Sequence, residues 1–410
     1  MEFEYKEIYK YPIDICLNIT DSCNLACKYC FVQQKPHFMT LDMAKKATDW
    51  LISNLEKRKE LGKKDEQVNI NFFGGEPTLL YEEIIVPLVL YGEEKYPNQI
   101  RFGITTNGTL LNKERIDFFT KHKIYLLLSI DGAKETQDFN RPQRNGEGSF
   151  DLVEKNISYL LENKPNTTFR ATLYQPTVKN LFENYRYAQR KGFKYIFFCP
   201  NAREKWTEEH IQEMKEQLDK IFIDRIIKYS MGQEPLKFSV LDKIYKKILE
   251  HDLQIYTNNF QKRNRHRGVV RCGLGTGSAS ISYEGLIFAC QEQDSRDTGD
   301  YFYIGDIFNG INIEKHTKIL KDYYEPKELI SENKDLCKNC LLYLTCHQDM
   351  CPSVSQDLFN TFFIRPEIDC IFYEYIMQKC IQEMQILVKE TKNELFKKYL
   401  DNLFKEYKEE

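Results

Sequence analysis

The stretch Cys23-Asn24-Leu25-Ala26-Cys27-Lys28-Tyr29-Cys30-Phe31 places three cysteines on one short loop with the spacing C-x3-C-x2-C. Three thiolates on such a loop match three iron atoms of a 4Fe–4S cubane and leave the fourth iron open for chemistry. Two alternatives are a zinc site that lacks its fourth ligand and unpaired cysteines of a core. Zinc loops usually offer two cysteines and a second pair elsewhere, so the triplet favours the cluster.

Length and composition limit the classes of protein to which the chain can belong. The chain has 410 residues, and we expect one large domain with a smaller appendage. Its 58 basic and 61 acidic residues nearly balance. The net charge therefore creates no electrostatic field that would attract nucleic acid or an anionic membrane surface. The first residues are charged and the chain contains no run of about 18 apolar residues, which predicts a cytosolic protein without a membrane span.

The 13 cysteines are hard to explain as disulfides, because a reducing cytosol keeps thiols free. Ligation of metals or clusters is the natural use for most of them. Cys16, Cys199 and Cys380 fall outside the clustered spacings, and we expect these three to be small buried hydrophobic residues.

Strand and helix patterns alternate along the first half of the chain. Strands are expected at residues 14–19, 68–73, 100–105, 124–130, 168–174 and 194–199. Helices are expected from residue 40 onward and at residues 81–91, 112–122, 150–163 and 178–192. This alternation predicts an α/β fold with parallel strands and ligand-binding loops at their carboxyl ends. Six repeats fall short of a closed eight-fold barrel, so we predict a partial (β/α)6 barrel of the TIM type.

The second half has a different composition. Helices at residues 207–231 and 237–252 bridge to it, and a hairpin is expected at residues 279–283 and 286–290. Residues 337–370 are rich in cysteine with little periodicity, so metal ligation is expected to replace a large apolar core there. The predicted domains are a barrel at 1–230, a helical linker at 231–267, a cysteine-rich domain at 268–370 and C-terminal amphipathic helices at 371–410.

Small and polar residues follow the predicted barrel strands. The turn Gly74-Gly75-Glu76-Pro77 can expose backbone groups to a ligand, although a Gly-Gly turn after a strand is more often only a turn. Arg141, further along the chain, can pair bidentately with a carboxylate. Hydroxyl, amide and carboxylate side chains that can bind a ribose or an amino-acid group follow the third and fourth strands, namely Thr106, Asn107, Ser129 and Asp131.

The cysteine loop after the first strand and the Gly-Gly-Glu-Pro turn after the second together resemble the radical S-adenosylmethionine (SAM) enzymes, over residues of about 12–200. The resemblance implies that Cys23, Cys27 and Cys30 bind a 4Fe–4S cluster whose open iron is chelated by SAM. It implies reductive cleavage of SAM to methionine and a 5′-deoxyadenosyl radical, which abstracts hydrogen from an unactivated carbon. It also implies an external one-electron donor such as flavodoxin or ferredoxin.

Contacts with SAM follow from the same resemblance. The turn Gly74 to Glu76 would contact the amino group, Arg141 the carboxylate and Tyr29 the adenine. The remaining implied contacts are Ser129 and Asp131 to the ribose, with Thr106 and Asn107 at the same mouth. Asp131 and other acids near the mouth can act as general base, and the sequence selects none of them.

The second half resembles the SPASM extension of this family, which implies two auxiliary 4Fe–4S clusters with interleaved ligands. The implied ligands of the outer cluster are Cys337, Cys340, Cys346 and Cys370, and those of the inner cluster are Cys272, Cys290 and Cys351. Cys346 and Cys351 are separated by four residues where the family has three, which affects only the loop geometry.

The inner set contains three cysteines. Family members that mature sulfatases place a further cysteine shortly after the position of Cys272, and residues Gly273 to Ser282 contain none. An open iron can bind a substrate thiolate, since coordination deprotonates a thiol. Thioether-forming peptide maturases are thought to work in this way. The alternative is that a local side chain or a water fills the fourth position.

The sequence therefore predicts a radical SAM peptide maturase that forms thioether crosslinks in a ribosomally synthesised, cysteine-containing precursor peptide. Alternatives are oxidation to formylglycine as in sulfatase maturation, carbon–carbon crosslinking or epimerisation, and an electron-transfer or cluster-storage protein without SAM chemistry. Cys23 comes early, so we expect no N-terminal leader-binding domain. A separate protein, the C-terminal helices or the basic run Lys262 to Arg271 would then bind a leader, unless that run is a solvated linker.

Overall fold

The computed structural model describes residues 4–65, 67–250, 272–294, 300–324, 329–338, 340–342 and 351–409. The basic run at 262–271 and Cys346 lie outside these ranges. The chain forms two compact units. The first comprises Met1–Ile130, Arg141–Thr167 and Val269–Pro326, and the second comprises Asp131–Asn140, Thr168–Gly268 and Lys327–Glu410. Within the described ranges, the helices are too short or too polar to cross a membrane.

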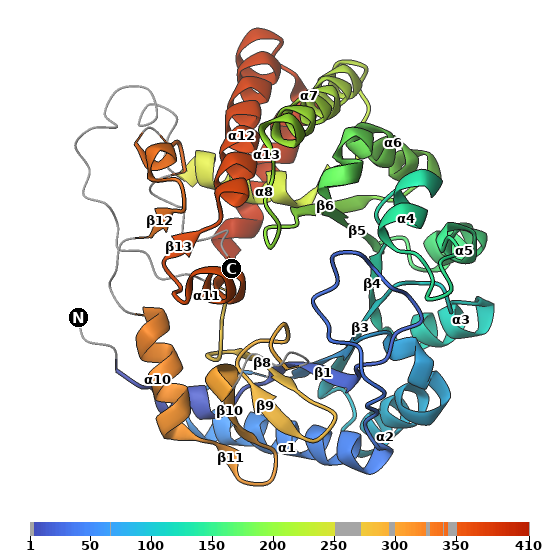
Figure 1. Ribbon diagram of the computed structural model, residues 1–410, viewed down its shortest axis with the longest axis vertical. Coiled ribbons are helices and arrows are strands. Elements are labelled where there is room, and N and C mark those ends of the chain that lie inside the picture. The colour runs from blue at the N-terminus through green and yellow to red at the C-terminus, as the bar shows by residue number, and fades with distance from the viewer. Residues whose placement is uncertain are drawn as a thin grey trace. The chain divides into compact units, whose positions relative to one another are not determined.

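The first unit is built on a sheet with the strand order β11-β10-β9-β8-β1-β2-β3-β4. The parallel strands are β1 (Asp14–Thr20), β2 (Val68–Gly74), β3 (Ile100–Thr106) and β4 (Tyr125–Ser129). The helices of this unit's barrel portion are α1 (Leu41–Glu60), α2 (Val86–Lys95) after a π-helical turn at Tyr81–Ile85, α3 (Lys113–Lys121) and α5 (Phe150–Asn163) (Figure 1). The predicted alternation of strands and helices is confirmed for these elements.

The two faces of this sheet differ in polarity. Ile15, Leu17 and Ile19 of β1 are at most 1% exposed and belong to the apolar core. The opposite face carries polar, half-buried side chains, where the Asn71 amide donates to Thr105 Oγ1 at 3.2 Å and lies 4.0 Å from Cys16 Sγ. Closed barrels fill their interior with branched apolar side chains. The polar face of this sheet therefore suits a polar ligand better than the interior of a closed barrel would. Cys16 is thus not in the apolar core, contrary to the prediction.

The hairpin that was predicted in the second half joins the same sheet. It consists of β8 (Ser278–Ile281) and β9 (Leu286–Phe288), which are antiparallel. The sequence did not predict that β8 also runs parallel to β1, with Asp14 opposite Ser278. The unit is completed by β10 (Tyr303–Asp306), β11 (Gly310–Ile311) and α10 (Ile313–Tyr324).

The second unit contains the parallel strands β5 (Thr168–Leu173), β6 (Tyr195–Pro200) and β7 (Lys237–Phe238). Its helices before residue 251 are α4 (Lys134–Asn140), α6 (Leu181–Lys191), α7 (Glu208–Ser230) and α8 (Ser239–Glu250). Two details correct the sequence prediction. Helix α4 was not predicted, and β7 was assigned to the following helix, because two residues are too few to show a periodic pattern.

Helices also make up most of the C-terminal part of this unit. The later elements are β12 (Ile330–Ser331), α11 (Pro352–Phe359), β13 (Ile364–Arg365), α12 (Glu367–Met384) and α13 (Glu394–Glu409). Helix α12 packs against α7 and α8, and α13 packs against α8 (Figure 1). The helix predicted to begin at residue 371 begins earlier, directly after Pro366, so Cys370 lies in its first turns and is buried. Cys380 is buried, as predicted, whereas Cys199 is half-buried.

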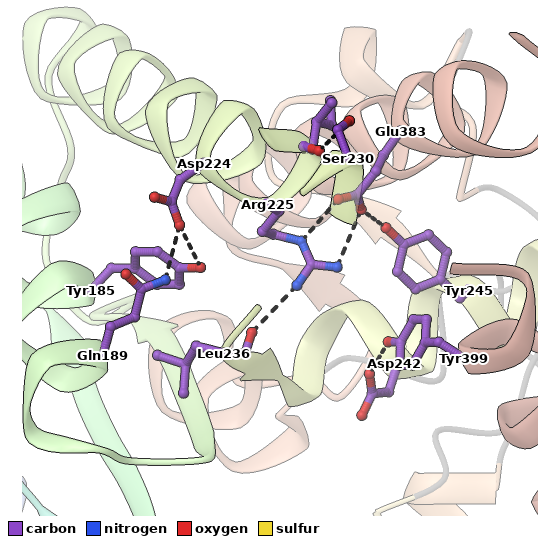
Figure 2. A network of polar contacts seen from close by, with 11 residues as sticks. Tyr185, Gln189, Asp224, Arg225, Ser230, Leu236, Asp242, Tyr245, Glu383 and Tyr399 are labelled. Atoms are coloured by element: carbon purple, nitrogen blue, oxygen red, sulfur yellow. Dashed lines mark hydrogen bonds and ion pairs between the residues drawn. The ribbon is translucent and has the colours of Figure 1, made fainter. Parts of the chain in front are cut away.

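A buried ion pair joins α7 to α12. Arg225 and Glu383 are 2% and 0% exposed, with 3.1 Å between Arg225 Nε and Glu383 Oε1 and 3.3 Å between Nη2 and Oε2. Figure 2 shows that Arg225 also donates to the Leu236 carbonyl and that the Tyr245 hydroxyl donates to Glu383. Buried charges are tolerated when they are paired and hydrogen-bonded in this way. The network therefore fixes α7, α8 and α12 relative to one another.

Removing one charge of this pair should be costly. We expect Glu383→Gln to lower the free energy of unfolding by about 3–5 kcal/mol, because Arg225 then keeps a buried charge without a counter-ion. The matched control is Glu394→Gln, which removes a solvent-exposed partner of Lys397 and should cost less than about 1 kcal/mol. Urea unfolding followed by circular dichroism measures both. Equal losses in the two variants would contradict the assigned role.

Candidate active site

The cysteine loop leaves the sheet at the carboxyl end of β1, where the register with β2 shifts between Asn18 and Thr20. Cys23 and Cys27 are half-buried and Cys30 is exposed. Burial, the nearby charge of Glu76 and the neighbouring Cys27 and Cys30 thiols raise the pKa of Cys23 to about 12.

The cysteine loop supplies three thiols as possible ligands of a cluster. Among the described residues, no three His, Cys, Asp or Glu side chains converge closely enough to hold one metal ion. Cysteines that hold a cubane bind three different irons and are therefore farther apart than the ligands of one ion. Cys27 and Cys30 nevertheless lie near enough to Cys23 to perturb its ionisation. The three thiols lie on one loop, as the ligands of a 4Fe–4S cluster would.

The Gly-Gly turn lies directly against the segment that leads into the cysteine loop. Gly75 N–H donates to the Thr20 carbonyl at 2.7 Å, and Glu76 N–H donates to the Ser22 carbonyl at 2.9 Å. Gly74 has a φ of +127°, and a Cβ at Gly74 or Gly75 would collide with the Thr20 or Ser22 carbonyl oxygen. Only glycine permits this approach, so both glycines are needed to bring the end of β2 to the loop.

The Glu76 carboxylate joins the ends of β2 and β3. It is 1% exposed and accepts hydrogen bonds from Thr78 N–H at 3.0 Å, Thr106 Oγ1 at 2.8 Å and Asn107 N–H at 2.7 Å. Burial raises the pKa of Glu76, while these hydrogen bonds oppose the shift by stabilising the carboxylate. Thr106 and Asn107, two predicted site residues, are thereby fixed beside the turn.

The loop after β3 also reaches the cysteine loop. Asn107 Nδ2 donates to Asn24 Oδ1 at 2.9 Å and lies 3.8 Å from Cys23 Sγ. The Asn107 side-chain oxygen in turn accepts from Thr109 N–H at 3.0 Å and from the Thr109 hydroxyl at 2.6 Å. The Asn107 amide is therefore held in one orientation, with its donor group toward the thiol.

Residues 141–144 cover the other side of the cysteine loop. The Arg141 guanidinium lies 5.4 Å from the centre of the Tyr29 ring. Ala26 N–H donates to the Pro142 carbonyl at 2.8 Å, and Arg144 Nε donates to the Cys23 carbonyl at 2.6 Å. Sequence reasoning missed Arg144 because the residue belongs to no motif.

Two predicted residues have other surroundings. Ser129 ends β4 in the first unit and is half-buried. Asp131 belongs to the second unit, is 2% exposed, and accepts from Thr172 N–H at 3.1 Å and from Asn140 Nδ2 at 2.9 Å. The two oxygens of the Asp131 carboxylate thus connect α4 to β5, and its role in binding a ribose or a proton stays a prediction.

The cysteines of the second half fall in both units. Cys272 and Cys290 belong to the first unit, and the second unit contains Cys337, Cys340, Cys351 and Cys370. In the first unit the Tyr323 hydroxyl lies 3.7 Å from Cys272 Sγ, and in the second Ser331 N–H donates to Cys337 Sγ at 3.2 Å. Hydrogen bonds to sulfur are one of the means by which proteins adjust iron–sulfur clusters.

A polar cluster beside β1 was not predicted. Asn18 Nδ2 donates to Asp294 Oδ1 at 3.0 Å and to Asp21 Oδ1 at 3.1 Å, and the Ser280 hydroxyl donates to Asp294. Burial, followed by the charge of Asp21, raises the pKa of Asp294 well above its ordinary value. The members come from β1, β8 and two loops, so no local sequence pattern connects them.

The model of the Radical SAM superfamily matches residues 17–181, which include the cysteine loop and the Gly74 turn. An uncharacterised protein of Methanocaldococcus jannaschii is 34% identical over 216 residues, which cover 50% of this chain and 70% of that protein. The chain belongs to the radical SAM superfamily. It is therefore an enzyme, and its cofactors include SAM and a 4Fe–4S cluster, as the sequence predicted.

Two other relatives align over most of the chain. A cysteine-type anaerobic sulfatase-maturating enzyme of Clostridium perfringens is 25% identical over 352 residues, which cover 82% of this chain and 88% of that protein. The radical SAM cyclopropyl synthase TigE of Paramaledivibacter caminithermalis is 23% identical over 381 residues, covering 90% of this chain and 74% of that protein.

A solved structure supports the fold. Native anSMEcpe with bound AdoMet and Cp18Cys peptide superimposes with a TM-score of 0.69 at 18% identity, over 92% of this chain and 98% of that chain. At this identity the likeness concerns the fold alone. It confirms the predicted α/β fold with a parallel sheet.

Replacement of one cysteine of the N-terminal loop should abolish the reductive cleavage of SAM. We expect Cys27→Ala to abolish formation of 5′-deoxyadenosine from SAM after reduction with dithionite, because two thiolates no longer hold the cluster. Cys199→Ala is the control, since Cys199 lies in β6 and outside every predicted ligand set. Chromatography of the nucleoside measures both. Turnover retained in Cys27→Ala would rule out the assigned cluster.

The Glu76 carboxylate should be needed for the shape of the site. Glu76→Gln replaces an acceptor by an NH2 group that faces the N–H donors of Thr78 or Asn107, and should cost about 1–3 kcal/mol of stability and weaken SAM binding. Thermal unfolding and equilibrium dialysis with SAM measure the two effects. Glu82→Gln, at an exposed position in the following turn, is the control and should match wild type. Unchanged SAM binding in Glu76→Gln would contradict this role.

Proposed function

We propose that this radical SAM enzyme modifies a cysteine-containing peptide, and that it joins the cysteine sulfur to a carbon of the same ribosomally made precursor in a thioether. The observation that carries the proposal is the inner set of auxiliary cysteines, which lacks a fourth member in the sequence that follows Cys272.

The N-terminal site would hold the cofactors with residues of the first unit. Cys23, Cys27 and Cys30 would ligate the SAM-binding cluster, and the Gly74 to Glu76 turn and Arg141 would orient the methionine part of SAM. When bound, SAM and the cluster supply an adenosyl radical for hydrogen abstraction. The half-buried polar face of β1 to β3 offers hydrogen-bonding groups to a peptide rather than an apolar wall.

The segment after Cys272 is short and contains no further cysteine. Thr276 N–H donates to the Gly273 carbonyl at 3.0 Å, and β8 begins at Ser278, so the connection is a tight turn with small residues. An inner auxiliary cluster on Cys272, Cys290 and Cys351 would keep one iron open to a substrate thiolate. Within the proposed domain 268–370, an outer cluster would use Cys337, Cys340, Cys346 and Cys370.

The bond changes at the peptide define the reaction. One C–H bond and one S–H bond break and one S–C bond forms, so the peptide loses two hydrogens. One hydrogen leaves as an atom to the adenosyl radical, and the other leaves as a proton with one electron, which the auxiliary clusters accept. An external one-electron donor of the flavodoxin or ferredoxin kind supplies the electron for SAM cleavage. A separate protein that binds the leader would be a further partner.

A second candidate is oxidation of a cysteine to formylglycine. It is favoured by the similarity to the cysteine-type sulfatase-maturating enzyme over 82% of this chain. The similarity to a cyclopropyl synthase over 90% of the chain supports carbon–carbon bond formation to the same degree. These reactions differ in their products, because formylglycine has lost the sulfur and a carbon–carbon link leaves the thiol free.

Mass spectrometry of the product tests the proposal. The anaerobically reconstituted enzyme, with SAM and dithionite, should convert a short cysteine-rich peptide encoded beside its gene into a product that is lighter by two hydrogens and has one fewer alkylatable thiol. The same peptide with the cysteine replaced by serine should remain unmodified. Loss of sulfur, or a product that is lighter by two hydrogens with every thiol still alkylatable, would contradict thioether formation.

A further inference from the structure

Helix α10 holds the segment that carries Cys272. Tyr323, near the end of α10, is 1% exposed. Its hydroxyl donates to Cys272 Sγ at 3.7 Å and accepts the N–H of Cys272 at 3.3 Å. One phenol group therefore contacts both the sulfur and the backbone of the same cysteine.

Two further residues of α10 fix the same segment. His316, on the same face two helical turns before Tyr323, is fully buried, and its Nδ1 lies 2.9 Å from the Tyr5 hydroxyl. Its Nε2 would lie 2.9 Å from a Cβ on Gly275, whose φ is +65°, so only glycine allows this contact. Tyr324 forms a hydrogen bond with the Thr276 side chain. Helix α10 thus holds residues 272–276 at three points. The Cys272 sulfur accepts hydrogen bonds from the Tyr323 hydroxyl and from the backbone N–H of Leu274 in its own segment.

We propose that Tyr323 is a positioning residue of the inner auxiliary cluster, whose hydroxyl hydrogen-bonds the Cys272 thiolate and raises the reduction potential of that cluster. This inference rests on the proposed function, because it takes Cys272 as a cluster ligand.

Electrostatics determines the direction in which the Tyr323 hydroxyl shifts the reduction potential of the cluster. Reduction adds negative charge to a cluster and its sulfur ligands, so a hydrogen-bond donor on a ligand sulfur stabilises the reduced form more than the oxidised form. The Tyr323 side chain is buried and Cys272 is exposed, so this hydrogen bond is sheltered from water on the side of the phenol. The thioether reaction releases one electron, and a higher potential favours its acceptance. The hydroxyl would thereby favour the oxidative half of the proposed reaction.

The chain provides a matched pair of variants. Tyr323→Phe and Tyr324→Phe each remove one hydroxyl from adjacent positions of α10 and keep the ring, but the Tyr324 hydroxyl hydrogen-bonds the Thr276 side chain. The reconstituted full-length proteins are titrated with dithionite and redox mediators, without peptide, and followed by electron paramagnetic resonance. The signal that changes on addition of SAM identifies the N-terminal cluster.

In Tyr323→Phe one auxiliary signal should move to a more negative midpoint. The expected loss is up to about tenfold in the equilibrium constant for reduction, which is about 59 mV for one electron. Iron content, the SAM-responsive signal and Tyr324→Phe should match wild type. Placing 3-fluorotyrosine at position 323, whose more acidic phenol is a stronger donor, should shift the midpoint in the opposite direction.

The outcomes separate this inference from the function on which it rests. Auxiliary signals with the same midpoint in wild type, Tyr323→Phe and the fluorotyrosine protein would overturn the role of Tyr323 and leave the proposed function standing. About four irons in the wild-type protein, instead of about twelve for three cubanes, would remove the auxiliary clusters and with them the proposed function.

Discussion

The buried carboxylate of Glu76 is the interaction on which the active site depends. It accepts hydrogen bonds from the loops after β2 and β3, and the backbone of the same residue donates to Ser22, directly before the cysteine loop. A single residue therefore connects the ends of two strands, through its side chain, to the start of the loop that carries the thiols, through its backbone. Because the carboxylate is sheltered from water, these hydrogen bonds are strong and the arrangement is rigid.

This rigid arrangement fixes the positions of the side chains around the cysteine loop. Asn107, fixed through Glu76, directs its amide to Cys23, and Arg141 and Arg144 approach the cysteine loop from its other side. On the same sheet, β8 continues from the Cys272 segment and runs parallel to β1. The strand that leads to the N-terminal thiols and the strand that follows Cys272 are thus neighbours in one sheet. In the proposed reaction this places the SAM site and part of the auxiliary site on a common framework.

The sequence predicted the alternating elements and the family because both are encoded locally. The triple cysteine, the glycine pair and the strand periodicity each occupy a few adjacent residues. It did not predict the pairing of β8 with β1, the Asn18 and Asp294 cluster, or the contact of Tyr323 with Cys272. Each of these joins residues that are far apart along the chain, and no single stretch of sequence records such a contact. The hydrogen bonds of Asp131 to Thr172 and Asn140 illustrate the same limit, since they join residues that are not adjacent in the sequence.

In the proposed reaction the N-terminal thiols leave one iron open, and SAM binds that iron through its amino and carboxylate groups. Electron–nuclear double resonance of the reduced wild-type protein, with SAM labelled by 15N in the amino group, tests this most directly. The account predicts a hyperfine coupling between the cluster and the labelled nitrogen, because the two are bonded. A reduced cluster that shows no coupling to the label in the presence of saturating SAM would contradict it.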